Sequence, residues 1–153
     1  MIAQIASDEF FSGYSPEQIY LTSDLHLFHT NIIKYCNRPF EYSAGGCAQM
    51  NEFILKKFDA LPEDCLIWNF GDVFLNLRLE NGRIMHEPVF IEKESDLVNI
   101  HGHTHDKMVT EDYFFSEYNK SFPRKKVNPE QYKNICMDAN DFQILKWKEI
   151  IKV

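Results

Sequence analysis

The chain has 153 residues and a formal net charge of -7, and 44% of its residues are hydrophobic. This length and apolar content allow one buried core, so we expect a single domain over residues 1–153. The negative charge disfavours an extended nucleic acid as a partner, because lysine and arginine must neutralise its phosphates, and it leaves small phosphate esters open.

Cysteine usage and terminal composition favour a cytoplasmic protein. The four cysteines form no Cys-x-x-Cys pair, so we expect reduced thiols and neither a disulfide framework nor a zinc knuckle. The first thirteen residues contain Asp8 and Glu9 and lack the basic start and apolar run of a secretory signal. No stretch is long enough to cross a bilayer, so we expect no membrane partner.

The first half of the chain predicts a strand followed by two helices. Residues 19–24, Ile-Tyr-Leu-Thr-Ser-Asp, predict a buried strand with a carboxylate at its carboxyl end. A short helix is expected over residues 30–37. Apolar residues at helical spacing predict an amphipathic helix over about residues 46–60. Its core-facing residues are expected to be Cys47, Met50, Phe53, Ile54 and Phe58.

Three further strands are predicted to end in possible metal ligands. Residues 65–70 lead into Gly71-Asp72, much as the first strand leads into Asp24. Residues 83–86 and 97–101 each end in a histidine. Because the carboxyl ends of strands form the usual binding edge in α/β folds, we expect these strand ends to converge on one site.

The C-terminal part predicts a loop and then two strands. Residues 113–129 are aromatic and basic, which favours a solvated loop, with a substrate-contacting basic patch over residues 124–126 as the alternative. Residues 132–137 and 142–145 predict closing strands joined by a turn at Asn140-Asp141.

The six histidines are concentrated in or beside short motifs that also carry carboxylates. Neutral imidazole and carboxylate groups together suit borderline divalent metals such as manganese, iron, zinc and nickel. The pattern therefore predicts a metal site. The motifs are Asp24-Leu25-His26-Leu27-Phe28-His29, Gly71-Asp72, His86-Glu87-Pro88 and His101-Gly102-His103-Thr104-His105.

In this order, Asp-x-His, a strand-terminal Gly-Asp and a late Gly-His-Thr-His resemble the calcineurin-like metallophosphoesterase superfamily. Residues 20–40, with Thr-Ser-Asp-x-His-x-x-His-x-Asn-Ile-Ile and Cys-Asn-Arg-Pro-Phe, are similar to a small bacterial and phage subgroup. The resemblance covers about residues 19–106. It implies an α/β fold, a layered α/β/β/α sandwich of two mixed sheets, with metals at the strand ends.

The resemblance also implies a ligand set and a reaction. Two divalent metal ions would be held by Asp24, His26 and His105 at the first site and by Asp72, His86 and His103 at the second, with Asp72 bridging the two. The implied activity is hydrolysis of phosphodiesters or activated phosphomonoesters by attack of a metal-bound hydroxide. A small phosphate ester, such as a nucleotide, would be the substrate.

One family motif, Gly-Asn-His followed by Asp or Glu, is absent. Only 13 residues, 73–85, separate Asp72 from His86, too few for the usual strand and helix. They predict a tight hairpin around Asn81-Gly82 instead. We therefore expect a sandwich shortened by about one strand and one helix, reduced activity, and an exposed sheet edge that favours a homo-oligomer.

Other residues are candidates for the missing roles. His29 is a candidate to contact the substrate phosphate, and Asn76 or Asn81 to offer an amide oxygen. Arg38 is a candidate phosphate clamp, because guanidinium matches phosphate oxygens in pairs, with a plain surface arginine as the alternative. His101 is expected to lie in its strand, in the core or orienting a ligand, and is left out of the metal set.

Two other functions stay open. A non-catalytic descendant that keeps metal or phosphate affinity is suggested by the absent motif. A zinc amidohydrolase or a histidine-rich phosphatase of a barrel type is disfavoured, because the chain opens with Asp-x-His and is far shorter than the roughly 250 residues of an eight-fold barrel.

Overall fold

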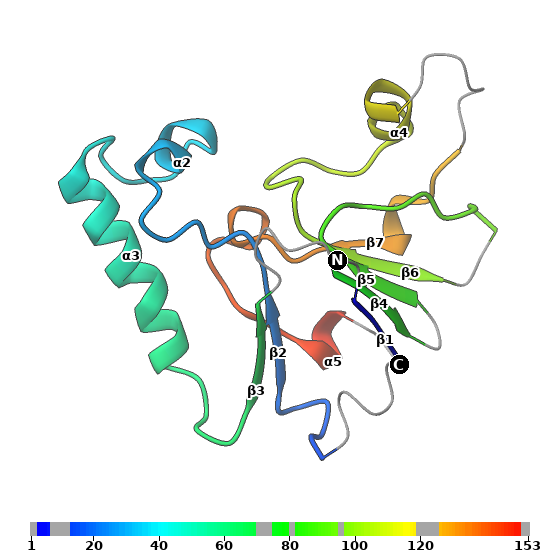
Figure 1. The fold of residues 1–153 in the computed structure, drawn as a ribbon, viewed down its shortest axis with the longest axis horizontal. Coiled ribbons are helices and arrows are strands. Elements are labelled where there is room, and N and C mark those ends of the chain that lie inside the picture. Colours follow the sequence, from blue (N-terminus) through cyan, green and yellow to red (C-terminus); the bar gives the residue numbers. More distant parts are fainter. Residues whose placement is uncertain are drawn as a thin grey trace.

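The computed structural model describes residues 3–6, 13–69, 75–79, 82–94, 97–118 and 126–150. These residues form a mixed α/β fold with two small sheets and four α-helices (Figure 1). No helix in these ranges has the length and apolar character needed to cross a membrane.

The larger sheet has five strands and the smaller sheet has three. Both are mixed, because β4 runs antiparallel to β5 and β8 antiparallel to β2, while the other neighbouring pairs are parallel. In spatial order the larger sheet contains β1 (Ala3–Ala6), β4 (Leu75–Leu79), β5 (Gly82–Met85), β6 (Val98–His101) and β7 (Tyr132–Asn134). The smaller sheet contains β3 (Leu66–Asn69), β2 (Ile19–Thr22) and β8 (Leu145–Lys146).

The helices are α2 (Thr30–Tyr35), α3 (Ala44–Asp59), α4 (Glu111–Tyr118) and α5 (Trp147–Ile150), with 3-10 helices at Pro129–Gln131 and Met137–Asn140.

The two sheets meet just beyond β2 and β7. Ser23 and Cys136 form an isolated parallel bridge there. The Ser23 amide donates to the Ile135 carbonyl and the Met137 amide donates to the Ser23 carbonyl, both at 3.2 Å. One buried cluster packs side chains of both sheets and α5 together, so the carboxyl ends of β2 and β7 are held side by side. It contains Ile19, Leu21, Ile100, Ile135 and Ile150.

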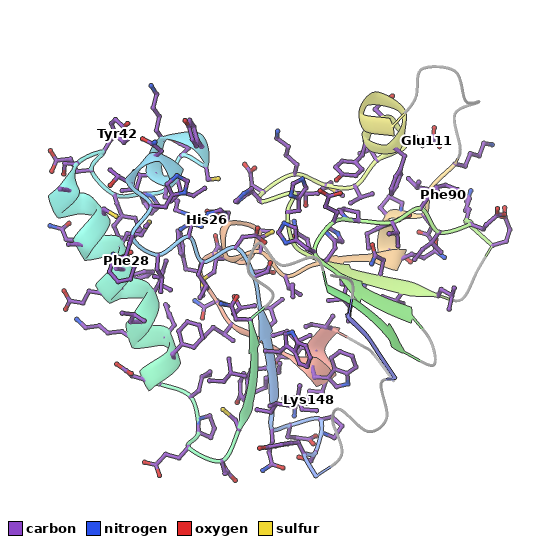
Figure 2. The ribbon with its side chains drawn as sticks, in the orientation of Figure 1. His26, Phe28, Tyr42, Phe90, Glu111 and Lys148 are labelled. Atoms are coloured by element: carbon purple, nitrogen blue, oxygen red, sulfur yellow. The ribbon has the colours of Figure 1, made fainter. Side chains whose placement is uncertain are left out.

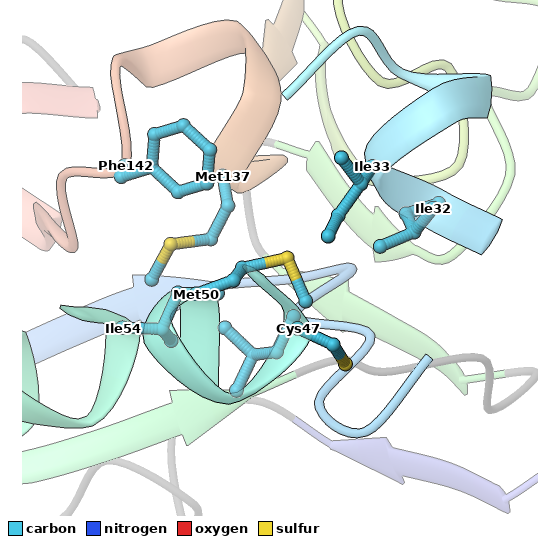
Figure 3. Close-up of a cluster of buried hydrophobic side chains, with 8 residues drawn as sticks. Ile32, Ile33, Cys47, Met50, Ile54, Met137 and Phe142 are labelled. Carbon is cyan, nitrogen blue, oxygen red and sulfur yellow. The ribbon is translucent and has the colours of Figure 1, made fainter. Parts of the chain in front are cut away.

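Helix α3 packs through the apolar face that its sequence predicts. Ser43 caps its start by accepting a hydrogen bond from the Gly46 amide at 3.0 Å. Phe53, expected to face the core, is instead 41% exposed, although its ring still lies 5.7 Å from that of Phe142. Figure 3 shows the buried cluster that α3 shares with α2 and the segment after β7, whose labelled members are Ile32, Ile33, Cys47, Met50, Ile54, Met137 and Phe142.

The expected hairpin before His86 is confirmed. β4 and β5 pair antiparallel, with Leu79 opposite Gly82. Gly82 therefore lies within a strand and not in the turn that Asn81-Gly82 predicts. Glu80 and Asn81 lie outside the described residues.

The expectations for the C-terminal part are met only in part. The expected closing strands at 132–137 and 142–145 are the shorter β7 and β8, and these belong to different sheets. The segment between them contains the 3-10 helix Met137–Asn140, which was not predicted from the sequence. The aromatic start of the expected loop at 113–129 is helical in α4, and Arg124 and Lys125 lie outside the described residues.

We expect Ile54→Ala to lower the free energy of unfolding by about 2 to 5 kcal/mol, because Ile54 is fully buried between α3 and its neighbours and its removal leaves a cavity. The adjacent Leu55, 46% exposed, is the matched control, and Leu55→Ala should change stability by about 0.5 kcal/mol or less. Urea unfolding of the two variants tests this, and equal losses would contradict the assigned core.

Candidate metal centre

Three of the predicted ligands converge at the carboxyl ends of β2 and β6. Asp24 and His26 follow β2, and His105 follows β6. Each of the three offers one ligand atom, and these atoms all lie within 4.8 Å of one another. The rings of His26 and His105 are stacked, with centroids 5.3 Å apart. Figure 2 shows His26 on the loop between β2 and α2. The structure therefore brings together the predicted first ligand set.

The backbone at the predicted ligands is unusual. Asp24, His26, His103 and His105 have φ values of 57°, 46°, 62° and 51°, in the left-handed region. They make up half of the eight non-glycine residues with positive φ in the described part of the chain. Such conformations cost a non-glycine residue of order 1 kcal/mol or more and cluster at functional sites. The fold thus maintains local strain at the residues that the sequence selects as ligands.

The Asp24 carboxylate is buried and held by three donors. Its Oδ2 accepts hydrogen bonds from Ser23 Oγ at 2.5 Å, Cys136 Sγ at 3.1 Å and the His103 amide at 3.1 Å. Burial alone would raise the pKa of this carboxyl, but these hydrogen bonds hold the pKa below its ordinary value of 3.8. The other oxygen, Oδ1, lies 3.9 Å from His26 Nε2. An ionised carboxylate with one oxygen fixed leaves the second as a ligand.

Gly102 is required for this close approach. A Cβ built on Gly102 would lie 2.5 Å from both Asp24 Oδ2 and Ser23 Oγ. The glycine in the Gly-His-Thr-His motif is therefore explained by the space that the carboxylate occupies.

The predicted second ligand set is represented in part. His86 Nε2 lies 3.2 Å from His103 Nδ1, and His103 Nε2 lies 3.8 Å from Glu87 Oε1. His86 Nδ1 is buried without a hydrogen-bond partner among the described residues. Within those residues His86 and His103 belong to no three-ligand cluster. Asp72 lies outside the described residues, so its bridging role stays a prediction.

His29 lies at the edge of the cluster. It precedes α2, is exposed, and its Nδ1 lies 3.5 Å from His26 Nδ1. Its contact with a phosphate stays a prediction. Asn76 lies in β4, and its side chain is not described.

Arg38 is neither a phosphate clamp nor a surface residue, and both of these expectations are wrong. Its side chain is fully buried. Nε and Nη2 donate to the two carboxylate oxygens of Asp138 at 2.7 and 3.0 Å. The guanidinium also donates to the carbonyls of Leu25 and Asp24, at 2.9 and 2.8 Å. Its donors are therefore committed inside the protein.

Sequence reasoning missed Asp138. Its Oδ2 lies 2.7 Å from His105 Nδ1, and it forms a second three-ligand group with His105 and Cys36. Burial opposes ionisation, but hydrogen bonds from His105 and Arg38 hold the pKa of Asp138 below its ordinary 3.8. The same hydrogen bond raises the pKa of His105. The one feature that could have identified Asp138 as a site residue was its position shortly after β7, at the same edge as the other candidate ligands.

The two remaining polar residues of the site are inert. His101 is 1% exposed within β6, and burial lowers its pKa to about 4, so it is a neutral core residue as expected. Burial raises the pKa of the Cys36 thiol to about 11, with Asp138 adding to the effect. Such a thiol stays protonated near neutral pH.

No protein-family model matches the chain, and no solved structure matches it. A curated relative, "Uncharacterized protein MJ1445" of Methanocaldococcus jannaschii, is 37% identical over 93 residues. The match covers 54% of this chain and 48% of the relative, so the chain spans about half the length of the curated relative it matches. The name of this relative assigns it no activity.

We expect Gly102→Ala to destabilise the protein and to weaken divalent-metal binding, because the new Cβ displaces the Asp24 carboxylate and the Ser23 hydroxyl. Gly45→Ala is the control, since a Cβ there meets only Ser43 Oγ at 3.8 Å within α3 and should stabilise by about 0.5 to 1 kcal/mol. Urea unfolding and titration calorimetry with Mn²⁺ would test this. Unchanged metal affinity in Gly102→Ala would contradict the assigned site.

We expect the stabilising effect of Asp138 to disappear in acid. A carboxyl whose pKa is lower in the folded than in the unfolded chain stabilises the fold fully above its ordinary pKa of 3.8, and this contribution is lost as the pH falls through the folded value. The unfolding free energy of the wild type relative to Asp138→Asn should therefore shrink as the pH falls from about 5 through the ordinary value of 3.8 and below it. Denaturant unfolding across this range measures it, and a constant difference would count against the assigned pairing.

Proposed function

We propose that the protein is a metal-dependent phosphoesterase that hydrolyses phosphodiesters or activated phosphomonoesters. The observation that supports this most is the convergence of Asp24, His26 and His105, with ligand atoms within 4.8 Å, in a strained backbone. Buried carboxylate with imidazole is the ligand set of catalytic divalent metals. The proposed substrates are small phosphate esters, nucleotides included, in the cytoplasm.

We propose that these donors hold a pair of divalent ions such as manganese, iron, zinc or nickel, and the cluster of Asp24, His26 and His105 supports the first of the two sites. Asp24 Oδ1 faces His26 while Oδ2 is occupied by protein donors, so the carboxylate is suited to bind through one oxygen. In the proposed arrangement His86 and His103 hold the second ion, and Asp72 bridges. When bound, such ions supply an activated water molecule and neutralise the charge that develops on the phosphate.

The chain's own residues would orient the ester. His29 is exposed beside His26 and is proposed to donate a hydrogen bond to a phosphate oxygen. Arg38 would act only indirectly, because its guanidinium is bound to Asp138 and to the carbonyls of Leu25 and Asp24.

The proposal extends to the fold. The two mixed sheets would be the central layers of an α/β/β/α sandwich shortened by about one strand and helix, with α2 and α3 on the side of the smaller sheet (Figure 1). β3 forms an edge of that sheet and its Ile67 is 38% exposed, which supports the expected self-association.

A second candidate is a non-catalytic descendant that binds metal or phosphate without turnover. The absent Gly-Asn-His motif favours it, because the residues between Asp72 and His86 include the directly paired strands β4 and β5 and no copy of that motif. Loss of general-acid help typically lowers a rate by about 10² to 10⁴. Esters with good leaving groups would depend on that help least.

We expect the protein to hydrolyse bis(4-nitrophenyl) phosphate in the presence of Mn²⁺. The released nitrophenolate measures the rate. His26→Asn should lower kcat/KM by about 10² or more, since it removes a ligand of the first ion. Asp106→Asn, at an exposed carboxylate next to His105, is the matched control and should retain the activity.

Metal binding measured in parallel separates the two candidates. Mn²⁺ affinity without turnover would favour the non-catalytic descendant. A protein that shows no turnover and binds none of Mn²⁺, Zn²⁺ and Fe²⁺ would overturn both candidate functions.

A further inference from the structure

Asp138 and Arg38 form a buried ion pair beside the metal centre. Their side chains are 4% and 0% exposed, and the guanidinium contacts both carboxylate oxygens. Paired contacts of this kind fix the plane of the carboxylate. Asp138 Oδ2 then lies 2.7 Å from His105 Nδ1. A rigid carboxylate thus faces one ring nitrogen of a predicted ligand.

We propose that Asp138 is a positioning residue that holds His105 in the Nδ1-protonated tautomer and so presents Nε2 as the donor beside Asp24 and His26. This inference rests on the proposed metal-dependent function. An imidazole can bind a cation only through a nitrogen that carries no proton. Donation of the Nδ1 proton to a carboxylate leaves Nε2 available and fixes the ring orientation.

The backbone of His105 is fixed from the same segment. Asn134 Nδ2 donates to the His105 carbonyl at 2.7 Å and to Thr104 Oγ1 at 3.0 Å. Asn140 Nδ2 donates to the carbonyls of Asn134 and Cys136 at 2.9 and 2.8 Å. Residues 134–140 therefore hold both the main chain and the ring of His105.

Arg38 links this segment to the other ligand-bearing loop. Besides Asp138, it donates to the carbonyls of Asp24 and Leu25. One guanidinium therefore connects the loop after β2, which carries Asp24, with the carboxylate that orients His105. Arg38 therefore contributes, with the Ser23–Cys136 bridge, to the relative placement of ligands from the two sheets.

A cation site at Cys36, His105 and Asp138 is the alternative explanation for this geometry, and the charges oppose it. Both Asp138 oxygens already accept from the Arg38 guanidinium, whose positive charge opposes a cation at that position. The contact between Asp138 and His105 is therefore assigned as an orienting hydrogen bond.

The test combines histidine side-chain NMR of the metal-free ¹⁵N-labelled protein with Co²⁺ titration. The wild-type His105 resonance, assigned by its loss in His105→Gln, should show the proton on Nδ1. Asp138→Asn can turn its amide NH₂ toward Nδ1, which moves the proton to Nε2, and should weaken Co²⁺ binding about 10- to 100-fold. Asp138→Glu should keep the tautomer and most of the affinity.

Asp141→Asn, at an exposed carboxylate in the same segment, is the matched control and should leave tautomer and affinity unchanged. A wild-type His105 protonated on Nε2 alone would overturn the inference whatever the Asp138 variants show. Equal Co²⁺ affinity of Asp138→Asn and the wild type would overturn it while the proposed function stands. Failure of the wild type to bind Co²⁺ would overturn the proposed function and the inference together.

Discussion

The structure depends on keeping the Asp24 carboxylate ionised inside the protein. Burying an unpaired carboxylate would be strongly unfavourable, and here three donors compensate. They come from three strand ends: Ser23 after β2, the His103 amide after β6 and Cys136 after β7. The contact therefore joins the two sheets at the candidate metal centre. Gly102 is part of the same constraint, because its missing side chain leaves the space for the carboxylate.

The candidate ligands lie where the fold holds backbone strain. Four predicted ligands occupy left-handed backbone conformations whose strain must be offset by surrounding interactions. The Arg38–Asp138 pair supplies one of them, and breaking such a buried pair typically costs about 3 to 5 kcal/mol. The apolar packing of α2 and α3 against Met137 and Phe142 supplies another. The polar groups at the site therefore belong to the framework of the fold.

Much of the local structure follows from the sequence. α3 was predicted because burial of one helix face imposes a recognisable period on apolar residues, and β2 and β6 because each is a short run of strand-forming residues that ends in a possible ligand. The hairpin of β4 and β5 follows from the short spacing before His86. The closing strands β7 and β8 were expected, but the sequence could not assign them to different sheets, since local alternation does not say which sheet a strand joins. Phe53 was misplaced because helical spacing sets the direction of a side chain but not how far the neighbouring elements cover it.

For the site, the sequence by itself determined which residue types are available and that Asp24, His26 and His105 follow strands, because ligand chemistry and strand periodicity are local properties. Only the tertiary structure decided their partners. Arg38 and Asp138 are 100 residues apart in sequence and meet through two sheets joined at one edge. The role of a charged side chain depends on which distant groups share its buried surroundings. An arginine that could have faced a phosphate therefore became an internal link, and an aspartate without a motif became the partner of His105.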